Sequence, residues 1–237
     1  MAGGAWRRDI IVSSGRAPPG FLPRVTLAIV GLCTLVFAVQ ALLGESARWD
    51  MLLGFSMIPA VVTGDRVLPA AIPTLGAAFS LLSAMFLHAD FWHLAGNMML
   101  LWLLGDGVEG AMGHLRFIVF YLLCGLAGAG AQILSDPGSL DPVVGASGAI
   151  SGVLAAALVL HPRTRLSLPL GRRRVVLPVS LYAAVAGWVG VQLADAMSGD
   201  AEETVAWLSH LGGFVAGTIL ALPFARPGEG VPPTSPP

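Results

Sequence analysis

The chain has 237 residues, of which 55% are hydrophobic and only 11% are charged, and its net charge at pH 7 is −1. Soluble domains carry about 25% charged residues, so this composition argues against an ordinary soluble domain and indicates an integral membrane protein. The two cysteines, Cys33 and Cys124, both lie in apolar runs. Buried cysteines usually act as small hydrophobic residues, and we therefore expect neither a disulfide framework nor a metal site.

Six apolar segments come close to the length of about 20 residues that a membrane-spanning helix needs. In chain order they are Val25–Gly44, Phe91–Gly105, Phe117–Ser135, Pro142–Pro162, Val175–Ala194 and Thr204–Ala225. The second segment is short and must gain length from its flanks. Between the first two, residues 45–82 form a long apolar loop that we expect to lie partly in the bilayer interface. The sequence thus predicts an all-α membrane protein with a six-helix domain over residues 24–226.

Arginine predicts the orientation of these helices, since the chain contains no lysine. Six spans put both termini on one side, where eleven of the arginines lie, and only Arg48 and Arg66 lie on the other. The positive-inside rule makes the richer side cytoplasmic. Residues 1–23 and the Pro-rich, disordered residues 227–237 are then cytoplasmic tails. We expect a multi-pass protein of the bacterial plasma (inner) membrane, and we interpret the basic run 172–174 as part of a cytoplasmic loop that fixes topology, not as a nucleic-acid site.

Polar residues inside membrane spans are costly and usually mark function. His93 and Asn97 are four residues apart and share one helical face, as do Ser147 and Ser151. Two alternatives remain open. Ser151 could donate to the carbonyl four residues earlier, and His93 with Asn97 could form an interhelical contact without a chemical role.

Two GxxxG motifs, at 148–152 and 213–217, predict close packing of the fourth and sixth spans. That packing would bring Ser147 within hydrogen-bond reach of His210, as a serine nucleophile meets its general base. His93, Asn97 and the Ser147 backbone N–H are then donors for a developing oxyanion. No intramembrane Asp or Glu is placed to orient His210, which predicts a dyad. A G-x-S-x-G elbow is excluded because position 149 is Ala.

The three blocks "HLAGN" (His93–Asn97), "GASG" (around Ser147) and "SHLGGFVAG" (Ser209–Gly217) resemble the signature motifs of the rhomboid family of intramembrane serine proteases. They occur on the second, fourth and sixth spans, as in that family. The resemblance implies a rhomboid-like six-helix bundle with Ser147 as nucleophile, His210 as base, and His93, Asn97 and the Ser147 amide at the oxyanion site. Supporting positions implied by the same resemblance are Gly145, Gly148, His88, Glu109, Gly213 and Gly217. One departure is that the family's frequent Trp-Arg pair in the first loop occurs reversed, as Arg48-Trp49.

The resemblance implies an endopeptidase, without cofactor, that cleaves single-span membrane proteins near the extracytoplasmic face of the lipid bilayer. A substrate helix must unwind there to expose its carbonyl, and the first loop and fifth helix would act as walls or as a gate. The alternatives are a catalytically inactive rhomboid-like protein that binds membrane segments, and a small transporter or channel. Transporters tend to show inverted repeats and charged midplane residues, and neither is visible here. The sequence indicates no oligomeric state.

Overall fold

The computed structural model describes residues 21–162, 165–170, 173–198 and 207–226. Its helices are α1 (Arg24–Leu42), α2 (Glu45–Phe55), α3 (Pro59–Val62), α4 (Ala77–Ser83), the 3₁₀ helix η1 (Ala84–Phe86), α5 (Phe91–Met112), α6 (His114–Ser135), α7 (Ser147–Leu160), α8 (Leu181–Ser198) and α10 (Trp207–Phe224). Two strands, β1 (Arg165–Leu170) and β2 (Arg173–Ser180), pair in antiparallel fashion. Residues 1–20 and 227–237 lie outside the described residues, so the two tails stay predictions.

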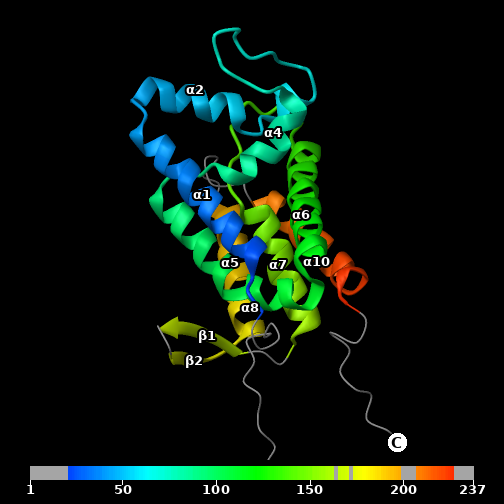
Figure 1. Ribbon diagram of the computed structural model, residues 1–237. Coiled ribbons are helices and arrows are strands. Elements are labelled where there is room, and N and C mark those ends of the chain that lie inside the picture. Colours follow the sequence, from blue (N-terminus) through cyan, green and yellow to red (C-terminus); the bar gives the residue numbers. More distant parts are fainter. Residues whose placement is uncertain (1–20, 163–164, 171–172, 199–206, 227–237) are drawn as a thin grey trace, which may run out of the picture.

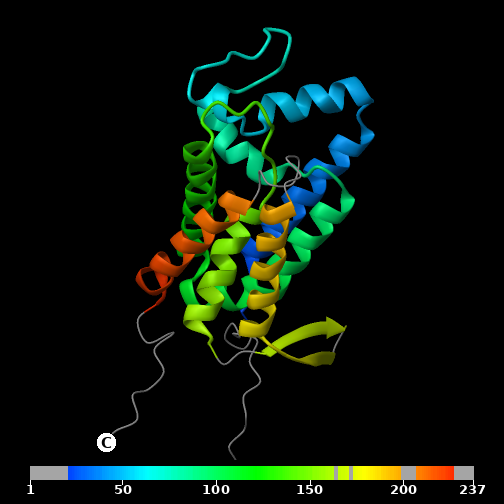
Figure 2. The same ribbon diagram turned by 180° about the vertical axis from the view of Figure 1, so that it is seen from behind.

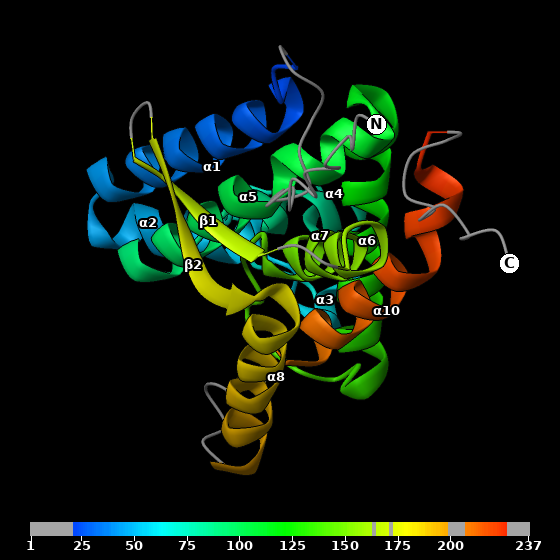
Figure 3. The same ribbon diagram turned by 90° about the horizontal axis from the view of Figure 1, so that it is seen from below.

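Helix α7 lies at the centre of the bundle (Figure 3), and most of its residues are buried. It packs against α5, α6 and α10, while α8 projects at the margin. Helix α2 and the first loop lie at the end where α7 begins, and the β1–β2 hairpin lies at the opposite end (Figures 1 and 2). The site residues on α7 are therefore held in place by three neighbouring helices, whereas α8 makes few contacts with the rest of the bundle.

Each of the six predicted segments overlaps a long helix: α1, α5, α6, α7, α8 and α10. Within the described residues, three of these are long and apolar enough to cross a membrane by length and composition, namely α1, α6 and α10. The helical membrane architecture is thus as expected, whereas the crossing of all six helices stays a proposal. Helix α7 has only 14 residues, which is about 21 Å at 1.5 Å per residue, less than the ~30 Å hydrocarbon core.

The boundaries of three segments differ from the expectation. Helix α5 does not end near Gly105 but continues to Met112, where Gly113 has a φ of +82°. The fifth segment begins as strand β2, and its helix starts only at Leu181. A run of β-branched valines and Pro178 disfavours helix before that point. This hairpin is the one departure from an all-α fold in the described part of the chain.

The fourth segment is helical only from Ser147, five residues later than expected, because the residues before it pair with the first loop. Met57 and Val143 exchange backbone hydrogen bonds of 3.0 and 2.8 Å, and the Gly145 N–H donates to the Ala84 carbonyl at 2.8 Å. An extended segment that forms such bonds cannot also form helix. The first loop is thus fixed to the chain that leads into α7.

Glu109, on α5, is completely buried and caps another helix. Its carboxylate accepts from the backbone N–H groups of Val25 and Thr26, at 3.0 and 2.8 Å, and from the Thr26 hydroxyl at 2.7 Å. The His114 Nδ1 lies 2.5 Å from the same carboxylate. Helix α1 begins after Pro23 without a side-chain cap of its own, so Glu109 satisfies the exposed N–H groups of its first turn. This contact fixes α1 against α5.

Candidate active site

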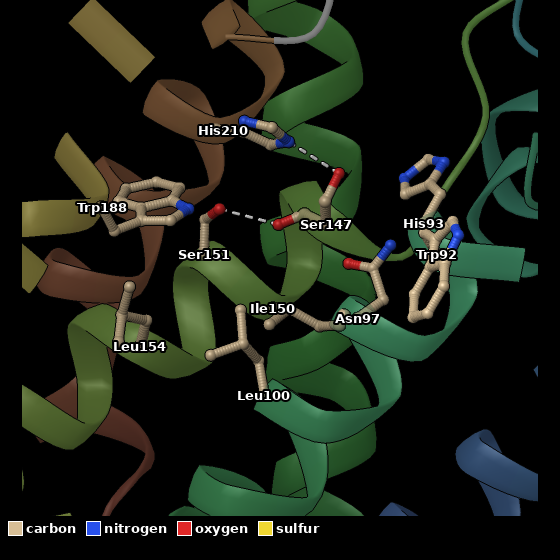
Figure 4. Close-up of a pocket in the computed structure, with 11 residues that line it drawn as sticks. Trp92, His93, Asn97, Leu100, Ser147, Ile150, Ser151, Leu154, Trp188 and His210 are labelled. Atoms are coloured by element: carbon tan, nitrogen blue, oxygen red, sulfur yellow. Dashed lines mark hydrogen bonds between the residues drawn. The ribbon is translucent and has the colours of Figure 1, made fainter. Parts of the chain in front are cut away.

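Ser147 and His210 form the centre of the candidate site. Ser147 is the first residue of α7 and His210 the fourth residue of α10, and they are 63 residues apart in sequence. The His210 Nε2 and the Ser147 Oγ are 2.7 Å apart (Figure 4). The proximity expected from the two glycine motifs is therefore present, whereas the chemical roles of the two residues stay predictions.

Glycines bring the two helices together. A methyl group at Gly213 would overlap the backbone of Gly148, and one at Gly217 would overlap the backbone of Gly152. The α7 and α10 backbones are thus in direct contact, as GxxxG packing requires. This contact sets the distance between the first turn of α7, with its serine, and the histidine of α10.

Gly145 accounts for the place where α7 begins. Its φ of +121° is a conformation that residues with a side chain rarely adopt. A methyl group at this position would lie 2.8 Å from the His93 Nε2 and 3.6 Å from the Ser147 Oγ. Glycine is therefore required by both backbone angle and space, and the His93 ring lies beside the serine because nothing stands between them.

Asp90 fixes the start of α5 and so the position of His93. Its carboxylate accepts from the backbone N–H groups of Trp92 and His93 at 2.7 and 3.0 Å. The bond from the His93 N–H has the larger effect and that from the Trp92 N–H a smaller one, and together they hold the pKa of the Asp90 carboxyl below its usual range. Asn97 follows one turn after His93 on the same face and is buried. Sequence reasoning missed Asp90, although an aspartate just before an apolar helix is a typical N-cap.

A cavity of about 590 Å³ joins these residues. Figure 4 shows Ser147 and His210 at its upper end and Leu100 and Leu154 at its lower end. It is lined by Trp92, His93, Gly96, Asn97, Leu100, Ser147, Ile150, Ser151, Leu154, Trp188 and His210. The cavity is polar where the serine and histidines lie and apolar below them.

The Ser151 hydroxyl donates to the Ser147 carbonyl at 2.7 Å. This is the local bond to the carbonyl four residues earlier that was one of the alternatives for Ser151 in the sequence. The Ser151 hydroxyl is thus bonded within its own helix, α7. Ser209 likewise has a packing role, since a methyl group at Gly148 would lie 2.8 Å from its Oγ.

His88 lies behind His93. It is completely buried, and the two rings meet edge to face with centroids 5.2 Å apart. Gln40 holds the His88 backbone, donating to its carbonyl at 3.2 Å and accepting from its N–H at 3.4 Å. Burial, with a smaller effect of the neighbouring His93, lowers the pKa of the His88 imidazole to about 4. His88 thus packs against His93 as a neutral group, whereas its supporting role in the site stays a prediction.

Trp188 and Gly96 are lining residues that sequence reasoning did not identify. The Trp188 ring lies 5.8 Å from that of His210 and stacks on Phe214 at 6.3 Å. A tryptophan on an apolar helix carries no sequence signal that separates a cavity wall from a lipid-facing residue. Within the described ranges, no group of three or more His, Cys, Asp or Glu side chains could hold a metal ion.

The model of the Rhomboid domain family matches residues 75–227 of this chain. The chain is 33% identical over 136 residues to the Rhomboid protease GluP of Bacillus subtilis, covering 57% of this chain and 24% of that protein. It is 32% identical over 128 residues to the RHOMBOID-like protein 5 of Arabidopsis thaliana, with 53% and 40% covered. For the mitochondrial Rhomboid protein 1 of Saccharomyces cerevisiae, the identity is 30% over 144 residues, with 59% and 40% covered. The chain thus aligns with less than half of each relative's length.

Proposed function

Because the chain belongs to the rhomboid family, we propose that it is an intramembrane serine endopeptidase that cleaves single-span membrane proteins. The observation that carries this proposal is the 2.7 Å contact between the Ser147 Oγ and the His210 Nε2, two residues that line the same cavity. A serine hydroxyl is a weak nucleophile unless a base accepts its proton. The contact supplies that base.

The proposed reaction follows the serine hydrolase scheme. The His210 Nε2 accepts the hydroxyl proton as the Ser147 Oγ attacks the scissile carbonyl carbon, which requires the ring proton to be on Nδ1. The tetrahedral intermediate collapses, the C–N bond breaks, and the imidazolium gives its proton to the leaving amine. Water then hydrolyses the acyl-enzyme with His210 again as base, which restores the serine.

The oxyanion formed in each step needs hydrogen-bond donors. We assign this role to the side chains of His93 and Asn97 and to the Ser147 backbone N–H. The N–H lies at the N-terminus of α7, where backbone donors have no partner within the helix and the helix dipole favours negative charge. The closeness of His93 to Ser147 supports this assignment, since a methyl group added at Gly145 would lie 2.8 Å from the His93 Nε2 and 3.6 Å from the Ser147 Oγ.

We further propose that all six long helices cross the plasma (inner) membrane with both termini cytoplasmic. The shortness of α7 supports this arrangement, because a 14-residue helix that ends at the cytoplasmic side starts below the outer surface. Ser147 would then lie in a recess that water reaches from outside. A substrate helix that unwinds there exposes its carbonyl to the serine.

The substrate would enter beside α8. The first loop is tied to the segment before α7 by the backbone bonds of Met57 and Val143, so it is a wall of the site. Helix α8 lies at the margin and reaches the cavity through Trp188. A helix with few contacts at the margin can move aside at a lower free-energy cost than a loop that is fixed by backbone hydrogen bonds.

The test is labelling of the full chain in detergent with a fluorophosphonate, followed by mass spectrometry and cleavage of a single-span reporter. We expect the label on Ser147, and we expect Ser147→Ala to abolish both labelling and cleavage. Ser151→Ala is the matched control, because it removes a hydroxyl one turn away, and it should retain both.

Reporter cleavage by Ser147→Ala would rule out the proposed mechanism. Capture of the reporter by the wild-type chain without labelling or cleavage would favour the inactive, segment-binding alternative. A label on Ser151 would move the nucleophile to that residue.

A further inference from the structure

Two arginines meet at one corner of the bundle, where α6 begins and α10 ends. Arg116 lies in the first turn of α6, and its Nη1 donates to the carbonyl of Ala225, the residue directly after α10, at 3.0 Å. Arg226 follows Ala225, and its backbone N–H donates to the carbonyl of Ala111, near the end of α5, at 2.9 Å. The end of α10 is thus tied both to α6 and to α5.

Gly113, between α5 and α6, leaves the space that the Arg226 side chain occupies. A methyl group at Gly113 would overlap the Arg226 guanidinium group. The φ of Gly113, +82°, also favours glycine. The Arg226 guanidinium therefore lies against the residue that precedes α6, three residues before Arg116, while the Arg116 guanidinium reaches the residue that precedes Arg226.

The protein does not neutralise these two charges within the described part of the chain. The ion pair found there joins His114 to Glu109, and no carboxylate pairs with Arg116 or Arg226. Arg116 uses one of its five N–H donors on Ala225, and the Arg226 side chain forms no hydrogen bond with a described residue. Both residues are exposed. Two cations with free, planar sets of donors match an anion with several oxygens, such as a phosphate group.

The surface next to this corner is apolar. Leu115 and Val119, near the start of α6, are 77% and 42% exposed, and Ile219 and Leu222, near the end of α10, are 66% and 56% exposed. Both helices are long and apolar enough to cross a membrane. Helix α6 has 22 residues, or about 33 Å, close to the ~30 Å thickness of the hydrocarbon core. Its first turn, with Arg116, is therefore at the level of the lipid headgroups.

We propose that Arg116 and Arg226 bind the phosphate of an anionic phospholipid, whose acyl chains lie on the exposed apolar side chains of α6 and α10. A phospholipid matches both features of the corner, because it joins a phosphate to apolar chains, whereas free phosphate matches only the arginines. A zwitterionic headgroup brings its own cation close to the guanidinium groups, so the site favours an anionic lipid. In the proposed topology the corner faces the cytoplasm, and that leaflet carries a negative surface potential from its anionic lipids.

Such a lipid would join the end of α10 to the start of α6. Helix α10 carries His210, and its C-terminal end is held at this corner by the bonds of Arg116 and Arg226. A ligand that binds only the folded state stabilises it, so anionic lipid should raise the thermal midpoint of the protein. The site is separate from the candidate active site, and the inference does not depend on protease activity.

The experiment measures the dissociation constant of the first lipid molecule bound to the full chain in detergent, by native mass spectrometry. Phosphatidylglycerol and phosphatidylcholine are compared. We expect the wild type to bind phosphatidylglycerol about tenfold more tightly, and we expect Arg116→Gln and Arg226→Gln each to weaken that binding about fivefold. Arg24→Gln is the matched control, because it removes the same charge from an exposed arginine at the start of α1, on the same side in the proposed topology. It should retain the wild-type preference.

Equal binding of the two lipids by the wild type, unchanged phosphatidylglycerol binding in both variants, or an equal loss in Arg24→Gln would overturn the inference. So would inorganic phosphate that raises the thermal midpoint as much as phosphatidylglycerol does at the same concentration, since the site would then bind a simple anion. Arg226→Gln keeps the test valid if Arg116→Gln, which also loses the bond to Ala225, does not fold.

Fluorophosphonate labelling of the same proteins separates this inference from the proposed function. If the wild type takes no label but prefers phosphatidylglycerol through the two arginines, the proposed function fails and the lipid site stands. If the wild type is labelled but shows no preference between the lipids, only the lipid site fails.

Discussion

At the scale of single residues, the site depends on groups that reach Ser147 from separate elements. His210 comes from α10, while His93 and Asn97 come from α5. Gly145 allows the approach of His93 because any side chain at that position would occupy the same space. In the proposed mechanism these side chains are the donors and the base, and the fold holds them in place before substrate binds, which is what electrostatic stabilisation of a transition state needs.

The proposed oxyanion donors, His93 and Asn97, give a kinetic prediction. Loss of one such donor typically lowers kcat about 10²–10³-fold. In the proposed mechanism, the Ser147 N–H or a water molecule partly takes over the hydrogen bond of a lost side chain. We expect Asn97→Ala to reduce kcat about 10²-fold and His93→Ala to reduce it more, because His93 also fills space beside Gly145. KM should change little, since these bonds act mainly in the transition state. Steady-state cleavage of a single-span reporter in detergent measures both constants.

Thermal unfolding of the same variants is the control. If Asn97→Ala loses activity only in proportion to a loss of folded protein, Asn97 has a packing role and the oxyanion assignment is wrong for this residue.

His88 gives a pH prediction. Its folded pKa of about 4 is below the value of about 6.5 in an unfolded chain, so the unfolded state binds more protons between these values. The contribution of His88 to stability is therefore complete above pH ~6.5 and is lost as the pH falls towards 4. We expect the thermal midpoint of the wild type to fall more between pH 7.5 and pH 5 than that of His88→Gln. Equal falls in the two proteins would show that folding does not lower the pKa of His88.

At the scale of elements, the α7–α10 contact determines whether Ser147 and His210 meet. Both helices carry glycines where their backbones touch, and Gly213 is placed against Gly148 without room for a methyl group. Helix α5 is the second organising element. It is capped by Asp90 at the end that carries His93, and its Glu109 caps α1 near the other end.

Gly213→Ala tests the helix contact. We expect it to lower the free energy of unfolding by about 1–3 kcal/mol, as overpacking does, and to reduce fluorophosphonate labelling because α10 moves away from α7. The matched control is Gly31→Ala on α1, where an added methyl group meets nothing within 4 Å. Gly31→Ala should leave the free energy of unfolding unchanged or raise it by about 0.5–1 kcal/mol, because alanine loses less backbone entropy than glycine when a helix forms. The measurements are thermal unfolding and probe labelling in detergent, and equal behaviour of the two variants would contradict the role given to Gly213.

At the scale of the whole molecule, the distribution of arginine and the position of the site predict one orientation. Helix α7, whose first residue is Ser147, begins on the side of the bundle that carries α2 and the first loop, and it ends on the side of the hairpin (Figure 1). If the positive-inside rule holds, the side that carries α2 and the first loop faces away from the cytoplasm.

A reporter fused after Arg226 should therefore be cytoplasmic, and one inserted at Gly64, in the first loop, should be on the outer side. Protease protection of intact cells or compartment-specific reporter enzymes distinguish the two. The reverse result would put Ser147 at the cytoplasmic face and contradict the proposed topology.

The sequence by itself determined the helical membrane class and the residues worth testing. A membrane span is a local property of length and apolar character, so α1, α6 and α10 are recognisable without a structure. Polar residues such as His93, Ser147 and His210 stand out in apolar segments because lipid penalises them. The glycine pairs also predict their own contact, because close helix packing needs small residues at a fixed spacing.

Only the tertiary structure decided which helix ends meet and what fills the space between them. Glu109 caps α1 although it is 83 residues away from Thr26 in sequence. Trp188 lines the cavity although it belongs to α8, a helix that follows the hairpin in the chain. Gly96 and Gly105 lie on the same helix, α5, yet a methyl group added at Gly96 would meet open space, whereas one at Gly105 would meet the Thr26 side chain of α1. These differences depend on how helices distant in sequence pack in three dimensions, and no local pattern of residues contains that information.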